Sequence, residues 1–114
     1  MKPSSSHLNS QIIIYEGSEG QPKIDVKIEG ETVWLNQKQL VDLFQSSKAN
    51  ISEHIKNIFL EKELTRDSVV RNFRTTALDG KSHDVEYYNL DLIISLGYRV
   101  KSDIATRFRQ WAHC

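Results

Sequence analysis

The segment NQKQLVDLFQSSKANISEHIKNIF, residues 36–59, decides the fold predicted for this chain. Asn36 is a good helix N-cap, and Gln39 three positions later completes the pattern of a capping box. Apolar residues then recur at helical spacing on one face: Leu40, Leu43 and Phe44. A polar turn at residues 45–47 follows. The segment therefore begins with a short amphipathic helix that ends in a tight turn.

A second amphipathic helix is predicted after this turn, with Ser46 or Ser47 as its cap. Its apolar stripe consists of Ile51, Ile55, Ile58 and Phe59. Its opposite face carries polar and charged side chains: Lys48, Asn50, Ser52, Glu53, Lys56 and Asn57. Two capped helices around a tight turn predict a helix-turn-helix, the motif that places its second helix in the major groove of DNA.

An ordinary antiparallel helix pair with a solvated outer face is the alternative. Val41 stands where a small residue normally lets the two helices approach, and Gln45 stands where glycine commonly makes the turn. Both residues favour a wider crossing or a variant turn.

Residues that precede the helix pair have the pattern of strands. Residues 11–15 are a β-branched run, and residues 23–29 alternate between apolar and charged side chains. Residues 29–31 form a turn before a further strand at residues 32–35. A β-hairpin is therefore expected before the helices, with its apolar residues in the core and Trp34 packed on the helices.

A second hairpin is predicted after the helices, from strands at residues 69–76 and 83–88. Asp79-Gly80 between them is typical of a type I′ turn. A hairpin in this place resembles the wing of a winged helix. Four residues would bring positive charge to the DNA backbone: Arg71, Arg74, Lys81 and His83. The acidic residues of the same hairpin favour a purely structural role instead: Asp79, Asp84 and Glu86.

Two helices complete the predicted fold. Asn89 caps the first, at residues 90–97, with Gly97 as its C-cap. The second is capped by Ser102 or Asp103 and runs from Ile104 to the end of the chain, where the sequence stops within it. Its apolar stripe is Ile104, Phe108 and Trp111. The expected class is thus α+β and winged-helix-like: hairpin, helix-turn-helix, hairpin wing and two C-terminal helices.

Length and composition predict a single domain at residues 11–114, preceded by a disordered, serine-rich tail at residues 1–10. The sequence has no apolar run long enough for a membrane span, and its beginning does not resemble a secretory signal. Its only cysteine, Cys114, forms no internal disulfide, which is consistent with a reducing compartment. We therefore expect a cytoplasmic protein that does not associate with membranes.

The charge distribution bears on DNA binding. The formal net charge is +0, which opposes strong attraction to phosphates. However, residues 15–35 carry five acidic and two basic residues, whereas residues 98–111 carry four basic and one acidic residue. The chain is thus dipolar. Such a domain should bind non-specific DNA weakly and depend on a dimer or partners for affinity.

Catalytic and metal-binding patterns are missing from the sequence. None of its four histidines has a second ligand at zinc-like spacing, and there is no Cys-x-x-Cys pair or phosphate-binding glycine loop. His83 and Asp84 are adjacent in a strand, so they point to opposite faces and do not form an acid–base pair. We expect no enzymatic activity, no cofactor and no bound metal.

Three segments carry a resemblance to a known family: VWLNQKQLVDLFQSSKANISEHIKNIF (33–59), VVRNFRTTALDGKSHDVEYYNLDLIISLGYRV (69–100) and the FRQWA ending (108–112). Together they resemble the N-terminal part of the RhuM virulence-protein family, which is similar to Bro-N and phage antirepressor N-terminal domains. The likeness is most specific at residues 85–100 and at Phe108-Arg109-Gln110-Trp111. It implies a DNA-binding or regulatory role. Family members usually continue into a C-terminal region, and the resemblance implies that any activity housed there is absent from residues 1–114.

The leading hypothesis is therefore a dimeric module that binds double-stranded DNA and regulates transcription or a mobile element. The second helix would contact bases or phosphates through Ser47, Lys48, Asn50, Ser52 and Lys56. The wing would add backbone contacts from Arg71, Arg74 and Lys81. The alternative is a protein–protein module, an antirepressor or adaptor without DNA contact. In that case Phe108 and Trp111 of the last helix would dock a protein partner or a second copy.

Overall fold

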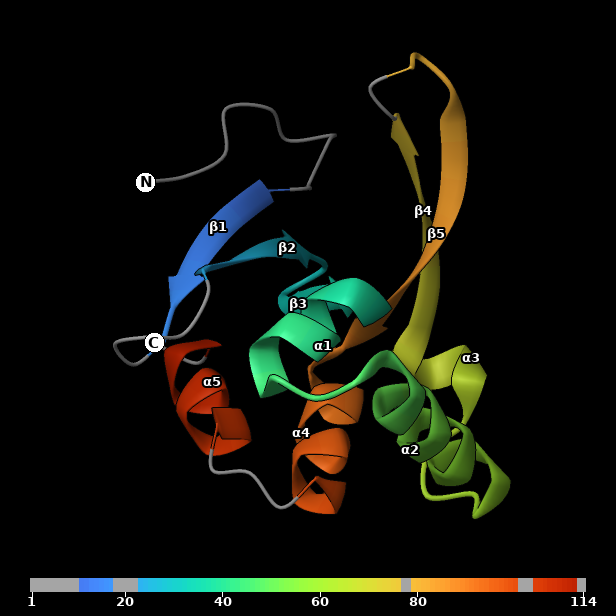
Figure 1. Cartoon of the computed structure of the whole chain (residues 1–114). Helices are drawn as coiled ribbons and strands as arrows, with labels where there is room; N and C mark the ends of the chain where they lie inside the picture. Colours follow the sequence, from blue (N-terminus) through green and yellow to red (C-terminus); the bar gives the residue numbers. More distant parts are fainter. Residues whose placement is uncertain (1–10, 18–22, 77–78, 101–103, 113–114) are drawn as a thin grey trace.

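The two hairpins predicted from the sequence are parts of one antiparallel sheet (Figure 1). The computed structural model describes residues 11–17, 23–76, 79–100 and 104–112. The strands are β1 (Gln11–Glu16), β2 (Lys23–Glu29), β3 (Thr32–Asn36), β4 (Val70–Thr76) and β5 (Ser82–Asn89). The helices are α1 (Gln37–Phe44), α2 (Lys48–Leu60), α3 (Arg66–Val69), α4 (Leu90–Arg99) and α5 (Ile104–Ala112). The α+β class is confirmed.

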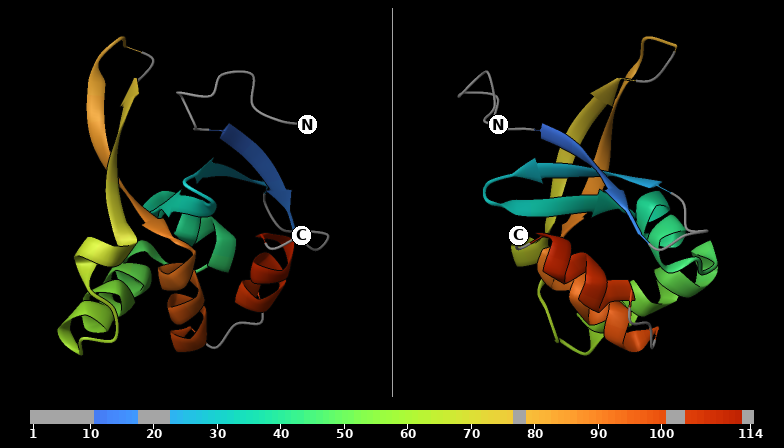
Figure 2. Two further views of the ribbon diagram at one scale, coloured as in Figure 1. Left: turned by 180° about the vertical axis from the view of Figure 1, so that it is seen from behind. Right: turned by 90° about the vertical axis from the view of Figure 1, so that its left-hand side faces the viewer.

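The sheet has the strand order β1-β2-β3-β5-β4. Its centre is the pairing of β3 with β5, in which Trp34 lies opposite Asn89 and Leu35 opposite Tyr88. The helices lie together on one face of the sheet, and no described element covers the other face (Figure 2). The far half of the β4–β5 hairpin projects beyond the helical layer.

The two hairpin turns differ from each other. Between β2 and β3, Glu29 pairs with Thr32, and both intervening residues have positive φ: +64° at Gly30 and +67° at Glu31. These are the angles of a two-residue type I′ turn. Between β4 and β5, Thr76 pairs with Ser82, so five residues connect the strands. The hairpin predicted around Asp79-Gly80 is confirmed, but its turn is not of type I′, because only Gly80 of this pair has a positive φ, +84°.

Three of the four described N-caps are predicted residues, and the fourth is Thr65 before α3, which was not predicted. The side chain of Asn36 accepts from the backbone N–H of Gln39 at 2.9 Å, and the Gln39 side chain accepts in return from the Asn36 backbone at 2.9 Å. The Ser47 side chain caps α2 by accepting from the backbone N–H of Asn50, and the Asn89 side chain caps α4 by accepting from that of Leu92. Each of these three caps satisfies a backbone donor that the helix leaves unpaired, so these helix starts are determined locally. Residues 102 and 103, the predicted caps of α5, lie outside the described residues.

The turn between α1 and α2 is tight, although it contains no glycine. Gln45 adopts a left-handed conformation with φ +51° and ψ +46°. Its N–H and that of Ser46 both point to the carbonyl of Val41, the latter at 3.2 Å. These bonds close the end of α1 and reverse the chain within three residues.

The hydrophobic core lies between the sheet and the helical layer. Its most deeply buried side chains come from β2, β3 and the helices: Val26, Leu35, Leu40, Ile51, Ile58, Val69, Leu92, Ile93, Leu96 and Phe108. The predicted stripes of both central helices are therefore correct, with Phe59 only half-buried. The predicted core position of residues 12–14 is wrong, because Ile12, Ile13 and Ile14 are exposed.

Trp34 packs on the opposite face of the sheet from the one predicted. Strand alternation sends its neighbours Val33 and Leu35 into the core beneath the helices, so Trp34 points the other way. There its ring contacts Phe73 edge to face, with centroids 5.8 Å apart. Its Nε1 donates to the carbonyl of Glu29 at 2.9 Å. Trp34 therefore packs between the two hairpins and does not contact the helix pair.

The C-terminal helices pack closely where they cross. Gly97 lies inside α4, which continues to Arg99, so its predicted role as a C-cap is wrong. A β-carbon added at Gly97 would lie 2.1 Å from the β-carbon of Ala105 on α5. Glycine is therefore required by the contact between the two helices and not by the helix end. The predicted tail at residues 1–10 and Cys114 lie outside the described residues.

Candidate functional site

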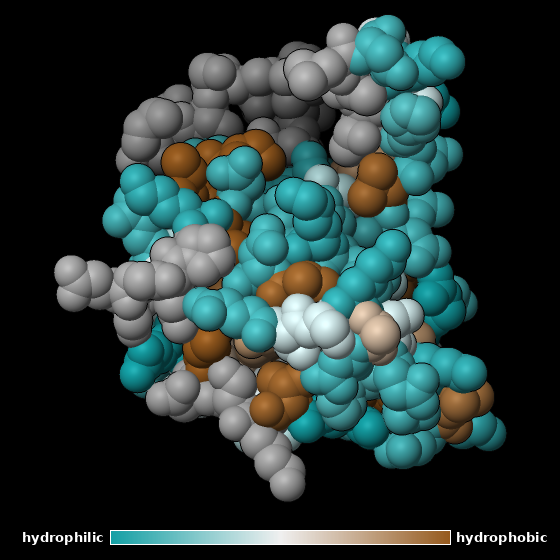
Figure 3. Space-filling model, in the orientation of Figure 1, coloured by the Kyte–Doolittle hydropathy of each residue, from teal (hydrophilic) through white to brown (hydrophobic). Residues whose placement is uncertain are grey.

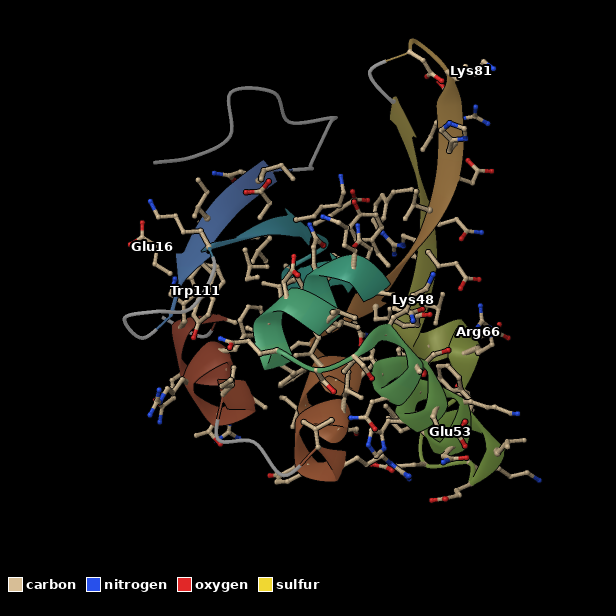
Figure 4. All side chains as sticks on the ribbon, in the orientation of Figure 1. Glu16, Lys48, Glu53, Arg66, Lys81 and Trp111 are labelled. Carbon is tan, nitrogen blue, oxygen red and sulfur yellow. The ribbon has the colours of Figure 1, made fainter. Side chains whose placement is uncertain are left out.

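The exposed face of α2 carries the main candidate site. Lys48, Ser52 and Lys56 recur every four residues, and all three are exposed. They line two adjoining hollows between α2 and the base of the β4–β5 hairpin. The larger hollow has a volume of about 690 Å³, and Asp84, Glu86 and Tyr88 of β5 form its far wall. Figure 4 shows Lys48 at the junction of α1, α2 and this hairpin.

The two hollows together form a groove between α2 and the β4–β5 hairpin. Ion pairs divide the charged residues around this groove into two groups. Arg66 of α3 pairs with Glu86, and Arg74 of β4 lies 3.7 Å from Asp84. In the described part of the chain, no ion pair involves Lys48, Lys56 or the exposed Lys38 at the start of α1. The acidic wall is thus neutralised by arginines, while the lysines opposite remain available to an anion.

The N-terminal end of α2 is held by side chains of the preceding turn. The Ser47 hydroxyl accepts from the backbone N–H of Asn50 at 3.0 Å. The Asn50 amide Nδ2 donates to the Ser46 hydroxyl at 2.7 Å. Gln37 of α1 also donates to the carbonyl of Lys48, at 3.5 Å. Ser47 and Asn50, both predicted site residues, are therefore exposed but already oriented by bonds within the turn.

The predicted wing residues do not share one surface. Arg71 lies on the sheet face opposite the helices, 4.9 Å above the Trp34 ring, and its Nη1 is 3.1 Å from Glu29. It therefore lies on the hairpin, as predicted, but on the face of the sheet that points away from α2. Arg74 lies on the helix side, opposite Asp84. Lys81 is at the far tip of the hairpin (Figure 4).

The predicted partner-binding residues are part of the chain's own core. Phe108 is fully buried, with its ring 5.0 Å from that of Tyr15 in an edge contact. Trp111 is half-buried and packs against both, with ring centroids 5.1 Å from Tyr15 and 5.5 Å from Phe108. Phe108 therefore cannot contact a partner in this structure, and only Trp111 retains some exposed surface.

A charge cluster fixes the C-terminal end of α2. Arg99 of α4 lies 2.6 Å from Glu61 and 2.8 Å from Glu63. The two carboxylates raise the pKa of the Arg99 guanidinium. The hydrogen bond from Arg99 in turn holds the pKa of Glu63 below its usual value.

Tyr88 lines both hollows between α2 and the hairpin. Burial raises the pKa of its hydroxyl, and the nearby Glu86 carboxylate raises it further.

Two groove residues were not predicted from the sequence. Lys38 lies on the first turn of α1, which was considered only for its cap and apolar face. Arg66 lies in α3, a short helix between α2 and β4 that was not predicted. Thr65 before a helix with Asp67 in its first turn is the signal that indicates this short helix.

The fold and site thus define a mixed α+β module with a basic helix beside a projecting hairpin. Residues 68–114 match the virulence protein RhuM family, which confirms the resemblance to this family over this part of the chain but not the expected placement in its N-terminal part. The match begins in α3 and runs to the end of the chain, so it does not include α1 and α2. Comparison with curated proteins and with solved structures gives no match.

No helix in the described ranges combines the length and apolar character needed to cross a bilayer. No three histidine, cysteine or acidic side chains come together there in a way that could hold a metal ion.

Proposed function

We propose that this chain binds double-stranded DNA, with α1 and α2 as a helix-turn-helix and the β4–β5 hairpin as its wing. The observation that carries the proposal is the row of Lys48, Ser52 and Lys56 along α2, exposed and without ion pairs to the acidic residues nearby. Unpaired lysines beside small polar side chains suit a surface that meets phosphates and base edges.

The length of this row fits a DNA groove. Lys48 and Lys56 are eight residues apart, which corresponds to about 12 Å along a helix. The major groove of B-DNA is about 12 Å wide and admits an α-helix, so Ser52 in the middle of the row can face base edges while the lysines at its two ends reach phosphates. Lys38 of α1 would add a further phosphate contact.

The hairpin supports the same orientation. Arg74 lies on the groove side and is held only by an exposed contact with Asp84 at 3.7 Å. Exposed ion pairs of this kind contribute little, so Arg74 can exchange its carboxylate for a phosphate. Lys81 at the tip would reach the DNA backbone beyond the recognition helix. Arg71 takes no part in this arrangement.

Salt-dependent binding to random-sequence duplex DNA tests the proposal. Lys48→Ala and Lys56→Ala should each weaken binding to all sequences and lower the slope of log K against log salt by about one unit. Lys23→Ala is the matched control, because Lys23 is also exposed but belongs to β2. Fluorescence anisotropy at several salt concentrations provides the measurement. Equal slopes for all four proteins would remove α2 from the interface.

Asn50 is the residue expected to distinguish between base pairs of the DNA. Selection of bound duplexes from a random pool should give a less restricted set for Asn50→Ala than for the native chain. The substitution also breaks the bond to the Ser46 hydroxyl, so Ser46→Ala is the control that breaks this bond alone. A base contact predicts relaxed specificity in Asn50→Ala only. The same change in both variants would assign the effect to the turn.

A protein–protein module without DNA contact is the alternative function, and the formal net charge of +0 favours it. The same titrations separate the two proposals. A complex that weakens steeply with salt supports DNA binding. No complex at low salt supports the adaptor.

A further inference from the structure

β1 combines two features that are rarely left exposed in a monomer. In the described part of the chain it has a sheet neighbour on one side only, which is β2. Its three central side chains are also exposed: 56% for Ile12, 36% for Ile13 and 54% for Ile14. Proteins usually protect such an edge with lysine, proline or a bulge, and residues 11–15 contain neither lysine nor proline. Figure 3 shows the resulting hydrophobic surface over β1.

The exposed side chains point to both faces of the sheet. Ile13 pairs with Val26, which is in the core, so Ile13 points toward the helices. Ile12 pairs with Lys27 and therefore points, with Ile14, toward the open face. A helix laid on either face would cover only one of these sets. An added strand covers both sets and also pairs the free backbone groups of β1.

The sequence of β1 is complementary to itself. In an antiparallel pair with Ile13 opposite its counterpart, Ile12 of each copy faces Ile14 of the other. This register brings together all six isoleucines and no charged side chain within residues 11–15. A shift by one residue would turn the partner's helices to the other face and remove the two-fold symmetry.

Helix α5 adds apolar surface next to the β1 edge. Trp111 of α5 lies near one end of β1 (Figure 4) and contacts Tyr15, with ring centroids 5.1 Å apart. It is only half-buried within its own chain. Its remaining surface therefore adds apolar area beside Tyr15 on the helix side of the sheet, the side to which Ile13 also points.

We propose that β1 binds β1 of a second copy, which joins two five-stranded sheets into one continuous ten-stranded sheet. The helices of both copies then lie on the same face. The proposal concerns the edge opposite the β4–β5 hairpin and does not depend on DNA binding. A dimer of this kind would also present two α2 helices related by a two-fold axis.

Sedimentation of the complete chain over a range of concentrations tests this dimer. The native chain should show a monomer–dimer equilibrium, and Ile12→Lys/Ile14→Lys should raise its dissociation constant by about a hundredfold or more. Both side chains are exposed, so the variant should keep the native circular dichroism and melting temperature. Leu60→Lys is the matched control, because Leu60 is 65% exposed but lies at the end of α2.

Cross-linking tests the register. In a Cys114→Ser background, Ile13→Cys places two thiols opposite each other across the two-fold axis. The expected Cα–Cα distance of about 4.5–5.5 Å permits a disulfide. Mild oxidation should give covalent dimers from Ile13→Cys and far fewer from Leu60→Cys.

Three outcomes would overturn the proposal. The first is a native chain that stays monomeric at every concentration, and the second is a double-lysine variant that dimerises as tightly as the native chain. The third is a monomer whose β1 amides lose hydrogen-exchange protection when residues 1–10 are removed, which would assign the edge to the chain's own N-terminal segment.

Discussion

The surface of α2 and the edge at β1 are both exposed, but they differ in the kind of partner that they can bind. On α2, the lysines without ion pairs are well solvated and can bind a negatively charged group such as a phosphate. On β1, apolar side chains and free backbone groups need another strand. Figure 3 shows this contrast, with a largely hydrophilic surface over α2 and the hairpin and hydrophobic side chains over β1. A formal net charge of +0 thus conceals two surfaces suited to different kinds of partner.

Both regions are supported by α4. Its C-terminal residue Arg99 holds the end of α2 through Glu61 and Glu63. Its Gly97 lies against Ala105 of α5, which in turn packs Phe108 and Trp111 beneath Tyr15 of β1. Substitutions at these points should therefore affect one region more than the other.

The largest effect is expected at the crossing of α4 and α5. Gly97→Ala forces the two helices apart, because the new methyl group would overlap Ala105. Overpacking of this kind should lower the free energy of unfolding by about 1–3 kcal/mol, measured by urea denaturation. The displaced α5 should also weaken self-association at β1 more than DNA binding through α2.

A compensating substitution serves as its control. Ala105→Gly removes the methyl group that Gly97→Ala meets, at a cost of about 1 kcal/mol for glycine within a helix. The double variant should be more stable than the sum of the two single effects predicts. Additive effects would show that the contact between these two residues is not the cause.

The turn before α2 should respond in the opposite direction. Gln45 has φ +51°, which is unfavourable for a residue with a β-carbon. Gln45→Gly should raise the free energy of unfolding by up to about 1 kcal/mol, after the entropy that glycine adds to the unfolded chain. Thermal denaturation of Gln45→Gly and Gln45→Ala measures the difference. An equally stable alanine variant would contradict this explanation, and self-association should be unchanged in both.

A smaller effect is expected from the one acidic side chain on the exposed face of α2. Glu53→Gln removes a charge that repels phosphates, so affinity for random duplex should rise by about two- to fivefold at low salt. Glu31→Gln in the β2–β3 turn is the control and should have no effect. If Glu53→Gln leaves affinity unchanged while the lysine variants reduce it, Glu53 faces away from the DNA.

The smallest effect concerns the anchor of α2 and depends on pH. Because Arg99 lowers the pKa of Glu63 in the folded chain, this pair stabilises the fold at pH values above about 4.5, the ordinary pKa of a glutamate. That contribution disappears as the pH falls through the lowered pKa. Glu63→Gln should therefore be less stable than the native chain at pH 7, and the difference should shrink toward pH 3. Urea denaturation at both pH values measures it, and a constant difference would exclude the ion pair as its cause.

Local features of the fold were predictable from the sequence. The caps Asn36, Ser47 and Asn89 depend on side chains within three residues, and the apolar stripes of α1 and α2 depend on helical spacing alone. The exposed position of Lys48, Ser52 and Lys56 follows from the same spacing. Their location beside the hairpin does not, because nothing in the sequence specifies which strands adjoin α2.

Features that depend on distant parts of the chain were not predictable. The pairing of β3 with β5 determines that Trp34 meets Phe73 rather than the helices. The burial of Phe108 requires the position of Tyr15, and the role of Gly97 requires the position of Ala105. In each case the sequence shows that the residue has a structural role. The residue it contacts, however, lies more than seven positions away, so the sequence does not show which contact it makes.

The β3–β5 pairing also constrains the order in which the chain folds. The β4–β5 hairpin closes a short loop, whereas β3 and β5 enclose the whole of α1, α2, α3 and β4. Closing such a long loop costs more entropy, so this ladder should form after the hairpin and should limit the folding rate. Until it forms, the β1–β2–β3 and β4–β5 parts of the sheet stay separate, and α1 can pack only on β2 and β3. Pulsed hydrogen exchange should therefore detect early protection in β4–β5 and late protection at Leu35 and Tyr88.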